Sequence, residues 1–201
     1  MGPADTIETV RETTATELDR LGSDKLLIAV TGATLEPAAV RTAAATRERG
    51  LARTLERWGV ETSETAVAGT FADAAADAVD RADRLDAEAE GDDALVAHLD
   101  TVAETPARVG AGLVAPPLLA DRFYLQVVNF FLNEPDRASA DRFREIRTGA
   151  ADLDYPSAAL ESLSSEEREQ AAAAAVDAIE AVYADYAETL EAMGLDPRPV
   201  C

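Results

Sequence analysis

Carboxylates on long helical segments are the residues of this sequence that could do chemistry. Glu17 lies on or beside the apolar stripe of segment 6–31, where it is a boundary carboxylate, a buried acid or a metal ligand. Inward carboxylates are the donor set of a di-metal bundle, which takes a Glu from each of two helices and Glu-x-x-His from each of two others. The only histidine is His98, which is a poor basis for catalysis and which we expect to be an ordinary, partly buried side chain.

Other catalytic signatures are missing from the sequence. It contains no P-loop, no G-x-G-x-x-G, no G-x-S-x-G, no C-x-x-C and no H-E-x-x-H motif. The only cysteine is Cys201, the last residue, which excludes a disulfide framework and a cysteine-based metal site. We therefore expect no catalytic residue, no cofactor and no bound metal.

Arginines are concentrated in segment 37–58, on what we expect to be its outer side. This side holds Arg41, Arg47, Arg49, Arg53 and Arg57, with Glu36, Glu48 and Glu56. Three of these arginines stand one helical turn apart on a single face, at positions 49, 53 and 57. Pairing with acids on a neighbouring helix is one interpretation, and contact with a small anion or phosphate is the other. Nucleic-acid binding needs a broader basic footprint.

The element that must organise the chain is residues 116–134, PPLLADRFYLQVVNFFLNE. Wound as a helix, this segment is apolar almost all round, which is typical of a buried helix. Its polar exceptions form one narrow stripe: Arg122, Gln126, Asn129 and Asn133. The amides of this stripe either bond to neighbouring backbone or lie in a homodimer interface.

Weaker, Ala-rich helices are expected to pack around this central helix. Helical periodicity predicts them over 6–31, 37–58, 63–88, 93–105, a segment capped by Asp136 or Ser139 that ends near 148, and 164–193. Gly32 and Gly194 are expected helix stops, Asp92 or Asp93 an N-cap, and Ser164 with Glu167 a capping box. Gly110, Gly112 and the Pro116–Pro117 pair are expected to interrupt the chain before the central helix, and residues 154–156 to form a loop. Short connections favour an antiparallel bundle.

Composition sets the class of protein. The 201 residues, 47% of them hydrophobic, predict one all-α domain: first helices over 1–90, then the central and C-terminal helices over 91–201.

The sequence is strongly acidic. Its 39 acids outnumber 18 bases, for a net charge of −21, and the only lysine is Lys25. Disorder, a basic partner and adaptation to molar salt compete as explanations, and sustained periodicity with arginine in place of lysine favours salt. With neither a signal peptide nor a membrane span, we expect a soluble, cytoplasmic protein.

Several segments carry a family resemblance. These are residues 18–25 (LDRLGSDK), 54–58, 71–85, 121–131 and 195–201. On them the chain resembles a haloarchaeal group of the rubrerythrin family, which implies a ferritin-like antiparallel bundle with additional C-terminal helices. The resemblance covers nearly the whole chain, but these segments are not catalytic motifs.

The metal pattern of that family is where this chain departs from it. By the resemblance, one Glu-x-x-His would fall on residues 78–81, where Ala78 and Arg81 stand, and the other on Glu48 and Leu51. Neither motif survives, although whether Glu17 and Glu48 keep metal affinity stays open. We expect the Arg81 guanidinium to form a salt bridge with Glu17 or Glu48 in the vacated site.

Three functions compete at this point. The first is a non-catalytic binding or regulatory module that acts on a protein partner or by self-association. The second is a peroxide-handling oxidoreductase with a metal held by carboxylates alone. The third is a transcription-related factor, which the resemblance implies weakly, or a TorD-like assembly chaperone. The support for a chaperone is the size of the all-α chain and the triplet Glu134-Pro135-Asp136, which is followed by Arg137 where histidine is expected.

Overall fold

The computed structural model describes residues 2–198, so the Cys201 on which the cysteine argument rests lies outside the described residues. Within this range the chain is all-helical and contains no β-strand, as expected. The helices are α1 (Pro3–Thr13), α2 (Ala15–Leu21), α3 (Lys25–Val30), α4 (Pro37–Glu61), α5 (Thr65–Asp83), α6 (Ala94–Leu99), α7 (Thr105–Val109), the π-helical turn η1 (Gly110–Val114), α8 (Ala115–Asn133), α9 (Arg137–Ala150), α10 (Asp154–Glu161) and α11 (Ser165–Ala192).

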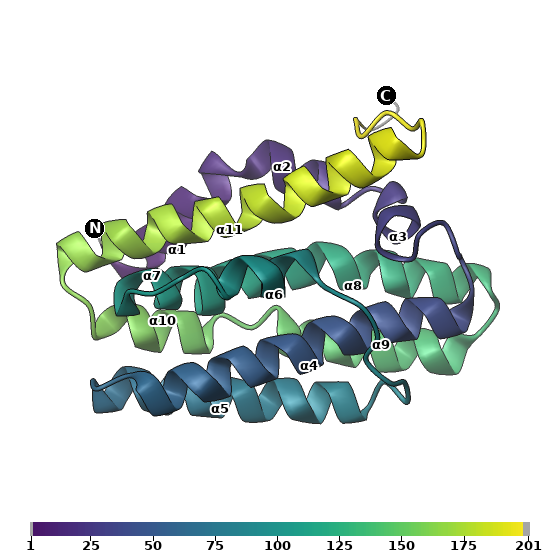
Figure 1. Cartoon of the computed structure of the whole chain (residues 1–201). Helices are drawn as coiled ribbons and strands as arrows, with labels where there is room; N and C mark the ends of the chain where they lie inside the picture. Colours follow the sequence, from purple (N-terminus) through teal and green to yellow (C-terminus); the bar gives the residue numbers. More distant parts are fainter. Residues whose placement is uncertain (1, 199–201) are drawn as a thin grey trace.

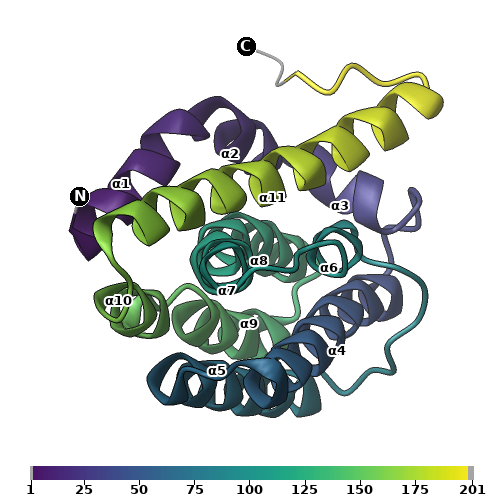
Figure 2. The ribbon, with the colours of Figure 1, turned by 60° about the vertical axis from the view of Figure 1, so that its left-hand side comes forward.

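Helix α8 is the centre of the arrangement, which confirms the prediction of a buried central helix. Figure 2 shows α7 and α8 nearly end-on, with α11, α3, α4, α5, α9 and α10 around them. Phe123, Tyr124 and Phe131 of α8 are each no more than 1% exposed. Phe143 of α9 stacks on Phe131, with ring centroids 5.1 Å apart, so α9 is fastened to α8 by aromatic contact.

Two groups of helices lie on opposite sides of α8. In Figure 1, α11 and the bent pair α1–α2 cross on one side, and the antiparallel pair α4–α5 lies on the other. Trp58 of α4 meets Phe71 of α5 edge to face, with centroids 5.7 Å apart. The buried apolar residues of both groups join in one hydrophobic cluster.

The first predicted helix is wrong as one continuous element, because residues 6–31 form three helices. The hydroxyl of Thr14 donates to the Val10 carbonyl at 2.8 Å, a back-bond that bends helices, and α1 ends there. A second break follows α2 at Gly22, which is the C-cap residue of that helix. The predicted stop at Gly32 is confirmed, since this residue has a φ of +57°.

The expected interruption before the central helix is also wrong. Residues 105–133 are helical throughout, in the run α7, η1 and α8. Pro116 and Pro117 have no backbone N–H to donate, and the turn before them widens: the N–H of Ala115 bonds the carbonyl of Gly110. The π turn therefore accommodates the prolines without ending the helix.

Helix starts follow the predicted capping signals, but three predicted ends are wrong: α4 continues to Glu61, α5 ends at Asp83 and α6 at Leu99. The capping box is confirmed: the Ser164 N–H donates to Glu167 Oε2 at 2.7 Å, and the Glu167 N–H to Ser164 Oγ at 3.3 Å. Asp136 caps α9 through the Ser139 N–H at 3.0 Å and also pairs with Arg41, so the carboxylate of the Glu-Pro-Asp triplet has a structural role. The predicted loop 154–156 is instead the first turn of α10, where proline is tolerated.

No helix among residues 2–198 combines the length and apolar character that crossing a bilayer requires.

Candidate functional site

Glu48 lies at the centre of a buried polar cluster that joins three helices. Its side chain in α4 is 3% exposed. Arg81 of α5 donates its Nε–H to Glu48 Oε2 at 2.9 Å, and the Tyr124 hydroxyl of α8 donates to Glu48 Oε1 at 2.6 Å. Both carboxylate oxygens are therefore engaged inside the protein by charge-assisted hydrogen bonds. We call these three residues the Glu48 cluster.

Burial of Tyr124 keeps the phenol of this cluster protonated. Loss of water contact raises the pKa of Tyr124 well above its ordinary value, and the charge and hydrogen bond of Glu48 raise it further. The phenol thus remains a donor to Glu48. Its ring stacks on Phe143 with centroids 6.1 Å apart, which holds the hydroxyl in place.

The predicted salt bridge of Arg81 is confirmed with Glu48 and not with Glu17. Among the described residues, Glu17 forms no ion pair with Arg81; it stands half-buried in α2. The prediction that Glu48 lies on the outer side of its helix is wrong. A signal was present, because Ala44, Glu48 and Leu51 continue the alternating spacing of four and three that marks the inner face.

The residues around Glu48 do not fit a di-metal centre. Leu51 and Ala78, at the positions discussed above, are buried and offer no donor atom. The guanidinium of Arg81 brings positive charge to the carboxylate that a cation would need. Over residues 2–198 there is no group of three histidine, cysteine, aspartate or glutamate side chains suited to hold a metal ion.

Arg47, the neighbour of Glu48 in α4, points to a different place. Its side chain is 8% exposed, so the prediction that this arginine is on the outer side is wrong as well. Its Nε–H donates to Asp93 Oδ2 at 2.9 Å, and its guanidinium lies 4.7 Å from the ring centroid of Phe123. Asp93 also caps α6 by accepting from the Val96 N–H at 3.2 Å, which confirms the predicted N-cap and fixes the carboxylate.

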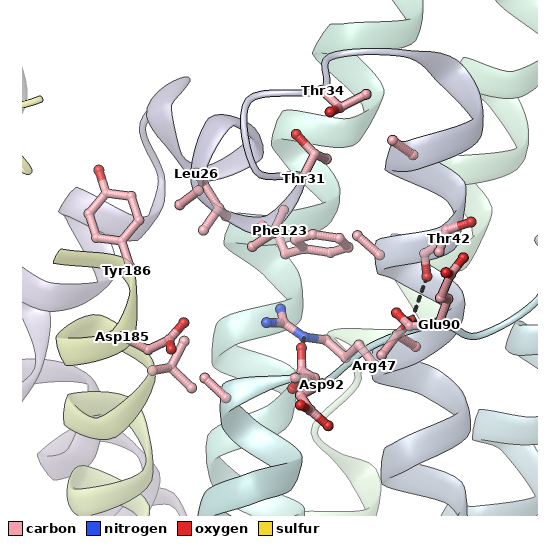
Figure 3. Close-up of a pocket in the computed structure, with 18 of the residues that line it drawn as sticks. Leu26, Thr31, Thr34, Thr42, Arg47, Glu90, Asp92, Phe123, Asp185 and Tyr186 are labelled. Carbon is pink, nitrogen blue, oxygen red and sulfur yellow. Dashed lines mark hydrogen bonds and ion pairs between the residues drawn. The ribbon is translucent and has the colours of Figure 1, made fainter. Parts of the chain in front are cut away.

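Arg47 forms the floor of a cavity of about 710 Å³, lined by α3, α4, α6, α8 and α11. This volume lies within the range of small-molecule sites. Figure 3 shows the guanidinium between Phe123 and Asp92, directed toward Asp185 on the opposite wall. Leu26 and Val182 supply apolar surface beside it.

Buried Thr46 holds the loop that closes one side of this cavity. Its hydroxyl accepts from the Glu90 N–H at 2.9 Å and lies 2.9 Å from the carbonyl oxygens of Thr42 and Glu90. The two bonds with Glu90 tie the chain before α6 to α4 and place Glu90, Asp92 and Asp93 at the cavity wall.

The cavity carries a strong excess of negative charge. Its charged lining residues are Glu36, Glu90, Asp92, Asp93, Asp185 and Arg47, five acids and one base, for a formal charge of −4. Asp185 makes no hydrogen bond or ion pair with any described residue. Partial loss of water contact raises its pKa, and so do the charges of Asp93 and Glu188, while Arg47 lowers it. The cavity therefore favours a ligand with positive charge.

The other predicted sites have ordinary structural roles. Arg49 pairs with Asp83 at 2.6 Å and Arg57 with Asp100 at 2.8 Å, which confirms pairing with neighbouring segments for these two; Arg53 is exposed. His98 is half-buried, as predicted.

In the amide stripe of the central helix, one side chain bonds to neighbouring backbone. Gln126 donates its side-chain amide to the Gly22 carbonyl, which confirms bonding to backbone at that position. Asn129 and Asn133 are exposed.

Comparison of the chain with protein-family models, with curated proteins and with solved structures finds no match.

Proposed function

We propose that this chain is a non-catalytic binding or regulatory protein built on a ferritin-like bundle of the rubrerythrin type. The Glu48 cluster is the observation that carries the proposal. A di-metal bundle needs free carboxylates and imidazoles that converge on one point. Here the inward glutamate is held by a guanidinium and a phenol, and Leu51 stands one turn further along α4.

The cavity beside the Glu48 cluster supports binding as the activity. It is bounded by five helices and by the chain before α4 and α6, and it is lined by a buried cation, Arg47, and by an exposed carboxylate without a protein partner, Asp185. Convergent polar groups on an apolar wall are typical of small-molecule sites. A protein partner or a second copy of the chain would then recognise, at the surface, whether this site is occupied by its ligand.

Metal content tests the non-catalytic part of the proposal. Protein produced in a halophilic host and kept in molar KCl is expected to contain no stoichiometric iron or manganese by inductively coupled plasma mass spectrometry. Glu48→Gln, which keeps the shape of the side chain, is the matched comparison and is expected to give the same result. Near-stoichiometric metal in the unmodified protein overturns the proposal, and its loss in Glu48→Gln would place that metal at Glu48.

Adaptation to molar salt is the second part of the proposal, and it rests on the net charge of −21. At low salt the surface carboxylates repel one another, whereas at about 1 M the Debye length falls to about 3 Å and this repulsion is screened. The free energy of unfolding in urea is therefore expected to rise steadily with KCl up to molar concentration. An unfolding midpoint that is flat or falls over this range would contradict the proposal.

A further inference from the structure

We propose that the cavity over Arg47 is a binding site for a small organic cation, an amine with a short apolar stem and an oxygen acceptor. This inference rests on the proposed function in one respect, that the chain acts by binding. It adds the place of binding and the chemical class of the ligand.

The charged end of the ligand is assigned by Asp185. Its carboxylate is exposed at the wall formed by α11, toward which the Arg47 guanidinium is directed, and has no hydrogen-bond or ion-pair partner among residues 2–198 (Figure 3). Asp92 lies on the wall formed by the chain before α6. An ammonium between these walls would gain a charge-assisted hydrogen bond and would relieve the repulsion among the carboxylates.

The oxygen acceptor is assigned by Arg47. This side chain is buried, and only its Nε–H is used, by Asp93. Its two terminal nitrogens donate to no described residue, although the guanidinium faces the cavity. These two nitrogens open onto the cavity, so an oxygen of a ligand could accept a charge-assisted hydrogen bond there, which an apolar group could not.

The net charge of the cavity selects among ligands that could use both groups. Arg47 is already paired with Asp93, so a free anion there would face the remaining four carboxylates without compensation. A neutral molecule would leave Asp185 without a counter-charge. Leu26, Phe123 and Val182 match a stem of a few methylene groups.

A series of four-carbon probes separates these possibilities. Isothermal titration in molar KCl compares 1,4-diaminobutane, 4-amino-1-butanol, 1,4-butanediol and succinate, which differ in charge at nearly constant length. High salt screens the general attraction of cations to an acidic surface. Saturable one-to-one binding is expected for the two amines, tightest for the amino alcohol, and none for the diol or succinate.

Two variants of α11 locate the site. Asp185→Asn is expected to weaken amine binding at least about tenfold, the loss of one charge-assisted hydrogen bond. Asp177→Asn makes the same change in net charge at an exposed position of the same helix, outside the cavity lining, and is expected to leave affinity unchanged. Circular dichroism checks that both variants are folded.

Several outcomes would overturn the inference. These are no saturable amine binding, preference for succinate or the diol, equal losses in Asp185→Asn and Asp177→Asn, or no loss in Asp185→Asn. The result is separate from the metal measurement. If the protein is metal-free and binds no amine, the non-catalytic proposal stands and this inference is wrong. If the protein contains metal and binds amines at Asp185, this inference stands and the non-catalytic proposal is wrong.

Discussion

Replacement of Glu48 by alanine is expected to lower the free energy of unfolding by about 3–5 kcal/mol, the usual cost when one partner of a buried ion pair is removed. The variant leaves the Arg81 guanidinium, only 14% exposed, without its carboxylate, and the buried Tyr124 hydroxyl without its acceptor. Urea unfolding in molar KCl, followed by circular dichroism, measures the loss.

Matched variants separate this cost from a general effect of charge. Arg49→Met removes the other arginine–acid pair between α4 and α5, but that pair is exposed, and a loss below about 1 kcal/mol is expected. The combined variant Glu48→Leu, Arg81→Met, Tyr124→Phe removes every polar member of the cluster and should recover most of the stability lost in Glu48→Ala. Equal stability of Glu48→Ala and the unmodified protein would show that the cluster is not formed in solution.

Gly110→Ala is expected to destabilise the fold by about 3 kcal/mol, at the upper end of the costs of overpacking. A Cβ at this position in η1 would overlap the carbonyl oxygen of Ala171 and lie 2.6 Å from its carbonyl carbon. Backbone atoms of α11 cannot rotate away as a side chain can, so the whole helix must shift. Thermal unfolding in molar KCl is the measurement.

The chain provides an internal control for this substitution. Gly69, in the exposed interior of α5, has open space where the Cβ of an alanine would lie, with no neighbouring atom within 4 Å, and its φ is not positive. Gly69→Ala is therefore expected to stabilise the protein by about 0.5–1 kcal/mol, because alanine loses less backbone entropy in a helix. A Gly110→Ala variant that is stabilised to the same degree would contradict the close approach of α11 to η1.

The two proposals meet at consecutive residues of one helix. Arg47 faces the cavity and Glu48 faces the helix pair α5 and α8, and their aromatic neighbours, Phe123 and Tyr124, are likewise consecutive in α8. The Glu48 cluster holds α4 against α5 and α8, and thereby fixes the direction of the Arg47 guanidinium. Loss of the Glu48 cluster should therefore impair amine binding as well as stability.

Parts of this arrangement could be predicted from the chain alone. The apolar circumference of residues 116–134 determined that α8 is buried, because an apolar surface of that extent must leave water. The capping signals at Asp93 and Ser164 placed the starts of α6 and α11, because a cap acts over three residues of local chain. The resemblance to a metal-binding family predicted that Arg81 pairs with Glu17 or Glu48, and the pair with Glu48 is the one that forms.

Other parts were decided only by tertiary structure. Periodicity could not show that Arg47 is buried, because its counter-charge comes from Asp93, 46 residues away, and its cover from Phe123. By local rules, Pro116 and Pro117 are expected to end a helix. They are instead accommodated by the π turn η1, which packs against α11, and the helix continues. The cavity itself joins α3, α4, α6, α8 and α11, and no local pattern encodes which side chains of distant helices are left facing an unfilled space. Local sequence determined most of the helical segments and the burial of the central one. The packing of the helices decided which charges are buried and which carboxylates, Asp185 among them, line the cavity without a protein partner.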